Sequence, residues 1–152
     1  MNVLVSKPPN YDEVVARFPF ARNQGVIFTY GQTIYNPSDI SISAALKCHE
    51  SVHAQRQGED EEGIREWWRR YLDEPMFRFE EELLAHRAEY RAFKGWEKNP
   101  RKVAQELESI AARLSGPLYG NVLTLAKARR LIVVDVDRKK VAKLLREPEM
   151  ST

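Results

Sequence analysis

The sequence predicts one α+β domain over residues 1–152 that is mostly helical, with a small antiparallel β element near residues 25–36. Apolar residues recur at three- and four-residue spacing from residue 42 onward, which is the pattern of amphipathic helices. The only convincing β pattern precedes residue 37. Charged residues make up 30% of the chain and hydrophobic ones 43%, a balance that suits one globular unit with its own core.

The first part of the chain is expected to hold an arm, one short helix and the β element. Residues 1–10 contain a pair of prolines and are predicted to be extended, and Asn10 can cap a helix over residues 11–18. Residues 26–30 are rich in β-branched and aromatic side chains, which favours a strand. Residues 33–35 can pair back across a Gly-Gln turn to complete an antiparallel hairpin.

A longer helix is predicted over residues 42–57, because no Pro or Gly interrupts this stretch and Gly58 follows as a stop. Residues 36–39 read Asn-Pro-Ser-Asp and are expected to supply the turn and the N-terminal cap. The apolar stripe of this helix includes His49 and His53, so both imidazoles are predicted to face the interior.

Further helices are predicted to complete a core over residues 25–120 and to continue through residues 121–152. Aromatic residues at helical spacing, first-turn prolines and clusters of turn formers mark their limits. They are expected over residues 61–72, 75–98, 100–114, 122–130 and 137–145. Residues 131–134, between the last two, fit either a helix or a strand.

The helix over residues 42–57 contains the motif His-Glu-x-x-His. Residues four apart lie on one face of a helix, so His49 and His53 can bind a single Zn²⁺ ion. Glu50 lies about 100° round from His49 and can take a proton from the water that the ion activates. Two inward histidines beside a carboxylate are costly to bury unless a cation satisfies them. The competing interpretation is a pair of core histidines beside a solvated glutamate.

A catalytic zinc ion needs a third protein ligand. No histidine follows His53 in the register of the metzincins, so this ligand must come from another helix. Helical angles place Glu82 in the middle of the apolar stripe of the helix over residues 75–98, with Glu81 at its margin. Glu82 is therefore the predicted ligand and Glu81 the alternative, while a non-metal interpretation pairs Glu82 with an arginine.

Other polar residues near this face have open roles. His86 shares the face of Glu82 and can be the metal ligand instead, a donor to the tetrahedral intermediate, or a polar core residue; we take it with Glu50 as a catalytic candidate. Glu89 can orient one of the histidine ligands or form a solvated salt bridge. The oxyanion donor can come from any of four tyrosines, namely Tyr30, Tyr35, Tyr71 and Tyr90.

The motif together with a glutamate from a later helix resembles the gluzincin branch of zinc metallopeptidases. More narrowly, residues 49–55, 68–72 and 77–85 resemble small His-Glu-x-x-His proteins of the minigluzincin type in phages and prophages. The resemblance covers about residues 25–120. It implies a zincin-like helical fold, a zinc ion, and an edge strand near residues 26–30 that holds an extended peptide by β-augmentation.

The same resemblance implies His49, His53 and Glu82 as the zinc ligands and Glu50 as the general base. The chain departs from the larger gluzincins after the third ligand. Those proteins carry a segment like Asn-Glu-x-x-Ser-Asp, whereas Glu82 is followed here by Leu-Leu-Ala-His. The groups that orient the ligands and stabilise the transition state are therefore left open.

The leading functional prediction is a zinc-dependent peptidase that hydrolyses a peptide or protein substrate. A second prediction is a structural or interaction protein, such as a phage virion component, in which zinc only holds helices together. Short basic clusters at residues 127–130 and 138–140 are typical of solvated faces, and with a net charge of +2 we expect no nucleic-acid partner.

Composition also bears on location. The single cysteine, Cys48, excludes an internal disulfide, is compatible with a reducing compartment and is expected to be a small packing residue. No apolar run is long enough for a membrane helix, and the apolar part of the N-terminus is too short for a secretory signal. We therefore expect a cytoplasmic protein without a membrane partner, or a virion-associated one if a phage encodes it.

Overall fold

The computed structural model describes residues 1–119, 121, 123–133 and 146. Within these residues the protein has six α-helices and one small sheet, which confirms the mostly helical α+β class. The helix predicted over residues 137–145 lies outside the described part of the chain.

The sheet has three short strands, β1 (Asn2–Leu4), β2 (Phe28–Tyr30) and β3 (Thr33–Tyr35). β2 and β3 form the predicted antiparallel hairpin, and its turn includes Gly31 at a φ of +59°, a conformation that favours glycine. β1 pairs with β3 in parallel, so the predicted extended arm adds a strand and the sheet is mixed rather than purely antiparallel. The strand order β1-β3-β2 leaves β2 at one edge.

Helix α1 (Tyr11–Arg17) is followed by a 3-10 turn, η1 (Pro19–Arg22). The prediction that the Asn10 side chain caps α1 is wrong. Asn10 has φ −98° and ψ 20°, outside the extended conformation that lets a side chain reach back to the helix. Its buried amide makes no hydrogen bond within the described residues. The ring of Tyr11 instead packs edge-on against Phe28 of β2, which attaches α1 to the sheet.

Helix α2 (Ala44–Gln57) carries the His-Glu-x-x-His motif. Its N-terminal cap is Ser43, whose hydroxyl accepts a hydrogen bond from the Leu46 amide, and not a residue of the 36–39 segment as expected. That segment forms a turn, in which the Asn36 side chain bonds to the backbone of Ile40. Gly58, at a φ of +80°, ends the helix as predicted.

The remaining described helices follow closely the expected limits. They are α3 (Glu61–Asp73), α4 (Pro75–Trp96), α5 (Pro100–Leu114) and α6 (Leu125–Val133), with a 3-10 turn η2 (Pro117–Tyr119) before the last. α6 begins three residues later than expected and includes residues 131–133, which decides in favour of a helix there. None of the helices in the described ranges is long and apolar enough to cross a membrane.

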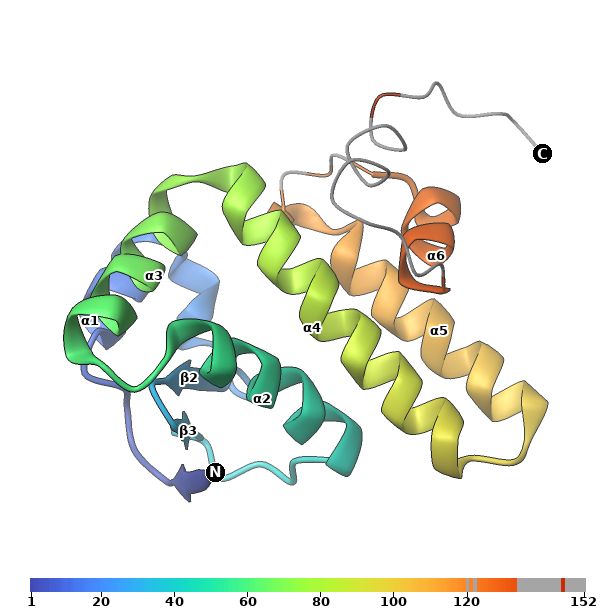
Figure 1. Cartoon of the computed structure of the whole chain (residues 1–152), viewed down its shortest axis with the longest axis horizontal. Helices are drawn as coiled ribbons and strands as arrows, with labels where there is room; N and C mark the ends of the chain where they lie inside the picture. Colours follow the sequence, from blue (N-terminus) through green and yellow to red (C-terminus); the bar gives the residue numbers. More distant parts are fainter. Residues whose placement is uncertain (120, 122, 134–145, 147–152) are drawn as a thin grey trace.

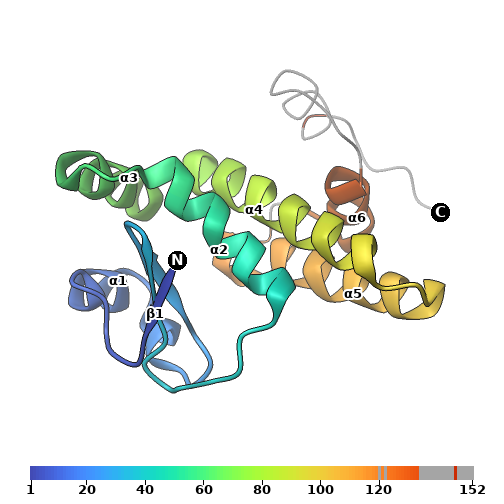
Figure 2. The ribbon, with the colours of Figure 1, turned by 60° about the horizontal axis from the view of Figure 1, so that its bottom comes forward.

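Two apolar clusters lie on either side of the pair formed by α2 and α4. The first joins α1, β2 and the aromatic face of α3, and the second joins α4, α5 and α6. α2 contacts both α4 and β2, and Figures 1 and 2 show it running alongside α4 with the strands on its other side. Polar side chains of α2 and α4 that face each other are therefore enclosed between two apolar regions.

Leu83 and Leu84 of α4 test this arrangement, because Leu83 is 2% exposed and Leu84 39% exposed. We expect Leu83→Ala to lower the free energy of unfolding by about 2–5 kcal/mol, because it leaves a cavity in the core. Leu84→Ala should change the free energy of unfolding by no more than about 0.5 kcal/mol. Urea unfolding followed by circular dichroism measures both, and equal losses would contradict the assigned burial.

Candidate metal centre

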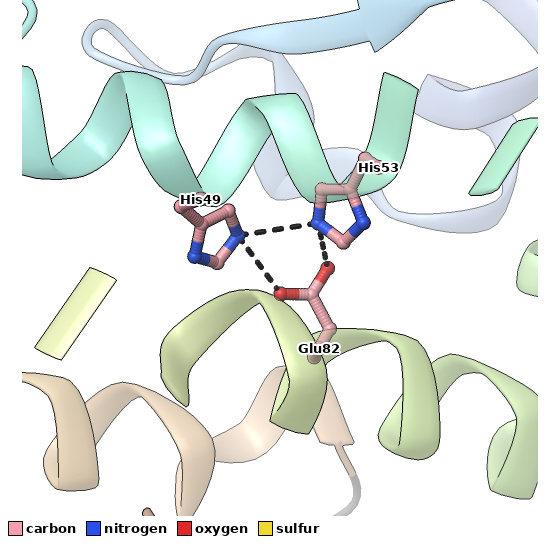
Figure 3. A group of neighbouring side chains, drawn as sticks. All are labelled: His49, His53 and Glu82. Carbon is pink, nitrogen blue, oxygen red and sulfur yellow. Dashed lines mark hydrogen bonds and ion pairs between the residues drawn. The ribbon is translucent and has the colours of Figure 1, made fainter. Parts of the chain in front are cut away.

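Three side chains from α2 and α4 converge on one point. The Nε2 atoms of His49 and His53 lie 3.2 Å apart, and each is 3.3 Å from a different oxygen of Glu82 (Figure 3). All three residues are buried. Their donor atoms lie within 4.8 Å of one another, so they form a group able to hold a metal ion. The structure thus brings together the three residues that the sequence nominates as ligands.

The local sequence explains why these side chains face each other. His49 and His53 are one turn apart on α2, and the face they occupy continues through Ala45 and Gln57, which are buried too. Glu82 lies on the buried stripe of α4. The small side chain of Ala85, fully buried on α4, is consistent with a close approach of the two helices.

Glu81 has a different environment from Glu82. Its carboxylate accepts hydrogen bonds from the Arg56 guanidinium at 2.7 Å and from the indole Nε1 of Trp67 at 3.0 Å. These partners satisfy it as a structural ion pair. Glu82 instead contacts the two histidines and accepts a hydrogen bond of 2.6 Å from the Tyr71 hydroxyl. Within the described residues, the geometry favours Glu82 over Glu81 as the ligand.

Glu89 orients His49 through Nδ1, the ring nitrogen remote from Glu82. One of its oxygens, Oε2, lies 3.1 Å from His49 Nδ1 and 3.2 Å from His86 Nδ1, and the other pairs with Arg113 at 2.6 Å. A carboxylate only accepts hydrogen bonds, so His49 donates from Nδ1. The lone pair of Nε2, the ring nitrogen on the Glu82 side, is then available to bind a cation at the site. Glu89 is buried and therefore takes the orienting role and not that of a solvated salt bridge.

Electrostatics at this centre favour a cation. Burial, the largest influence, lowers the pKa of His49, but hydrogen bonds to Glu82 and Glu89 raise it to about 10. Burial acts against ionisation of Glu82 as well, yet the two neighbouring histidines hold its pKa well below its usual range. The surroundings of the His49 Nε2 atom therefore stabilise positive charge, and a metal ion supplies such charge where the three donors meet.

A second group, His49, His86 and Glu89, has donor atoms close enough for a metal ion. It is less suited to one, because the Arg113 guanidinium already neutralises the Glu89 carboxylate. Both histidines also direct Nδ1 at that carboxylate, an arrangement that N–H donation explains without a metal ion. Of the two groups, His49, His53 and Glu82 are therefore the better suited to hold a metal ion.

His86 lies beside this centre and is fully buried. Its Nε2 atom is 3.7 Å from Glu82 Oε2 and has no hydrogen-bond partner in the described part of the chain. Burial lowers the pKa of His86 to about 4, so the ring is neutral near pH 7. With the Nδ1 proton directed at Glu89, the Nε2 atom is an acceptor, which argues against the expected donor role toward an oxyanion. A catalytic role for His86 stays a prediction.

Glu50 lies beside the three side chains of this centre. Its Oε1 atom is 4.0 Å from His49 Nε2, and its Oε2 atom accepts a hydrogen bond of 2.6 Å from the Thr29 hydroxyl on β2. Glu50 is 7% exposed, so it is not the solvated glutamate of the competing interpretation. Sequence reasoning missed Thr29, because one threonine in a predicted strand carries no signal of a partner 21 residues away.

A cavity of about 410 Å³ opens onto the centre. His49, Glu50, Glu82 and His86 line one part of it, and Arg113 lies in the same wall. Most of its other lining residues are apolar, and many come from the segment that runs from α1 through the η1 turn to the residues just before β2; they include Val14, Phe18, Phe20, Ala21, Val26 and Ile27. A smaller cavity of about 80 Å³ lies between β2 and the same three metal-binding side chains. The centre is therefore reachable by a ligand with an apolar portion.

The lining of this cavity narrows the choice among the tyrosines that could be the oxyanion donor. Tyr71 lines it, whereas Tyr30 donates its hydroxyl proton to Glu61 away from the centre. Tyr119, which sequence reasoning missed because it lies in a loop dense in turn residues, lines the cavity as well. Burial, and after it the charge of Glu82, raises the pKa of both Tyr71 and Tyr119, so both phenols keep their protons.

Comparisons of this chain with protein-family models, with curated proteins and with solved structures found no match. The resemblance to small gluzincins thus stays a prediction.

Glu82→Gln and Glu81→Gln form a matched pair that tests the ligand assignment. We expect Glu82→Gln to lower the zinc affinity of the protein by at least about tenfold, because an amide oxygen is a poorer ligand than a carboxylate. Glu81→Gln should keep the wild-type zinc affinity and lose stability, since it breaks the ion pair between the buried Glu81 carboxylate and the half-exposed Arg56 guanidinium. Competition with a chromogenic chelator measures both affinities. The reverse outcome would move the ligand role to Glu81.

Glu89→Gln tests the orienting role. We expect zinc affinity to fall about 10- to 100-fold, because the His49 ring loses its charged anchor. The control is Glu66→Gln, which removes an exposed carboxylate paired with Arg69 on α3 and should leave zinc affinity unchanged. Equal affinities in the two variants, measured with the same chelator, would show that Glu89 does not position His49.

Proposed function

We propose that this protein is a zinc-dependent metallopeptidase in which Glu50 is the general base. The observation that carries the proposal is the convergence of two imidazole nitrogens and one carboxylate beside Glu50, at the wall of a cavity. Zinc is the proposed ion because two histidines and a glutamate form a donor set that catalytic zinc sites use. Three protein ligands are also the number that leaves a position for substrate or water.

Zinc, when bound, polarises the substrate carbonyl and lowers the pKa of a coordinated water toward neutrality. The chain supplies the proton transfers. Glu50 Oε1 accepts a proton from the attacking water and passes it to the departing amine, so that the peptide bond yields a carboxylate and an amine. The neutral ring of His86 offers an acceptor beside this path, and the phenols of Tyr71 and Tyr119 offer O–H groups near Glu82.

The proposed substrate is an extended peptide that pairs with β2. In support, β2 is an edge strand of the described sheet, and edge strands present backbone groups to which a further strand can bond. The Thr29 carbonyl is an exception, because it already accepts a hydrogen bond from the Gln57 side chain. Residues 25–27, which lead into this strand, and Phe28, its first residue, line the large cavity. A peptide alongside β2 therefore directs a side chain into an apolar space next to the metal centre.

A second candidate is a non-catalytic protein in which the metal ion holds α2 and α4 together. The observation that favours it is the His86 Nε2 atom, which has no hydrogen-bond partner among the described residues. It lies 3.7 Å from Glu82 Oε2, close enough to become a fourth ligand after a small shift. X-ray absorption spectroscopy of the zinc-loaded protein distinguishes the two. Three histidine ligands would favour the structural role, and two histidines with a water ligand would favour the peptidase.

Glu50→Gln tests the peptidase proposal. We expect the variant to bind one zinc ion per chain and to lose hydrolysis by about 10²- to 10⁴-fold, because the amide cannot accept the proton. The control is Glu59→Gln, which changes an exposed carboxylate after α2 and should leave both properties unchanged. Mass spectrometry of a peptide library provides the readout. No cleavage by the zinc-loaded wild-type protein, or full cleavage by Glu50→Gln, would contradict the proposal.

A further inference from the structure

A chain of three buried hydrogen bonds joins the edge strand to the helix that carries the motif. The Thr29 hydroxyl donates to Glu50 Oε2 at 2.6 Å, and the Gln57 side-chain amide donates to the Thr29 carbonyl at 2.9 Å. The Gly31 amide then donates to Gln57 Oε1 at 2.7 Å. Both the side chain and the backbone of Thr29 are thus held by residues of α2.

The Thr29–Glu50 hydrogen bond is shielded from water. Thr29 is 3% exposed and Glu50 is 7% exposed, so water has little access to compete for either group. The Thr29 hydroxyl is the donor of this bond and the carboxylate oxygen its acceptor. A charge-assisted bond of this length restricts rotation of the carboxylate about its last torsion.

The two oxygens of Glu50 consequently have different environments. Oε2 is held by Thr29, while Oε1 lies 4.0 Å from His49 Nε2, toward the point where the metal-binding atoms meet. Oε1 is therefore the oxygen that receives the proton in the proposed reaction. Without Thr29, either oxygen could turn toward the metal centre or away from it, and the productive orientation would be populated only part of the time.

Because Gln57 bonds to Thr29, the position of Thr29 is set by α2 as well as by the β2–β3 hairpin. Gln57 lies seven residues, or about two turns, after Glu50 on the same helix, and its amide bonds to backbone groups on both sides of residue 30. The β2–β3 turn, the general base and the two histidines thus belong to one rigid unit. A peptide paired with β2 would be placed in a constant position relative to Glu50.

We propose that Thr29 is a positioning residue that fixes the Glu50 carboxylate with Oε1 toward the metal centre, with Gln57 anchoring Thr29 to α2. This inference rests on the proposed peptidase function and goes beyond it, because it assigns separate roles to the two oxygens of the base.

The experiment compares Thr29→Val with Thr29→Ser in the zinc-loaded full-length protein. Valine matches the shape of threonine but lacks the hydroxyl, and we expect kcat to fall about 10- to 100-fold with KM within about twofold. Serine restores the donor and should recover most of the wild-type kcat. Thr33→Val makes the same change in β3, outside the site, and should leave kcat unchanged. A wild-type kcat in Thr29→Val, or an equal loss in Thr29→Ser, would overturn the proposal.

A second measurement separates this proposal from the peptidase proposal. Acetohydroxamate chelates zinc and donates a hydrogen bond to a neighbouring carboxylate, so its affinity reports the position of Glu50 even if no peptide is cleaved. We expect Thr29→Val to weaken its binding about tenfold when Glu50 is present, and by less than about twofold in a Glu50→Ala background. Equal effects in the two backgrounds would overturn the positioning role.

Failure of the peptidase proposal and failure of the Thr29 proposal give different results in these experiments. Zinc-loaded wild-type protein that cleaves no peptide but shows the hydroxamate coupling would refute the peptidase and keep the Thr29–Glu50 interaction. Should Thr29→Val lose its fold or its zinc, Thr29→Ala removes the hydroxyl without adding bulk between β2 and α2, and the same two measurements apply to it.

Discussion

The site depends on one physical constraint, which is the burial of three carboxylates between two apolar clusters. Glu50, Glu82 and Glu89 are each at least nine-tenths buried, and Arg113 is a fixed cation that pairs with Glu89 alone among them. A buried carboxylate is tolerated only where donors or cations satisfy it. Hydrogen-bond donors provide part of the compensation, and the raised pKa of His49 shows that its surroundings also favour positive charge. A metal ion suits that requirement better than a neutral pair of rings.

The packing of α2 against α4 fixes the side from which each polar group reaches the site. α2 contributes two imidazoles and the proposed base within five residues, and α4 contributes Glu82 and, two turns later, Glu89. One helix of the pair therefore supplies both a candidate ligand and the carboxylate that hydrogen-bonds to another candidate ligand. Glu89 reaches His49 from the side of the ring remote from Glu82, so the two carboxylates contact opposite nitrogens of that ring.

The two histidines are held by different means. His49 has a charged hydrogen-bond partner at Nδ1, whereas the Nδ1 atom of His53 has none within the described residues. The ring of His53 packs instead against Trp67 and Tyr71 of α3. Aromatic packing restricts the ring without selecting its tautomer. The aromatic face of α3, expected from the sequence to be core, thus also forms part of the wall of the metal centre.

The sequence by itself predicted the helices and the three candidate metal ligands, because both follow from the periodicity of side chains along each helix. Helical spacing placed His49 with His53 and set Glu82 apart from Glu81. Local rules failed at Asn10, where the backbone leaves the capping conformation, and in residues 36–39, where side chains close a turn. Tertiary structure alone decided the partners of these groups. Thr29, Tyr119 and Arg113 lie tens of residues from the motif. Only the packing of separate elements brings Thr29 to Glu50, Arg113 to Glu89, and Tyr119 to the wall of the cavity.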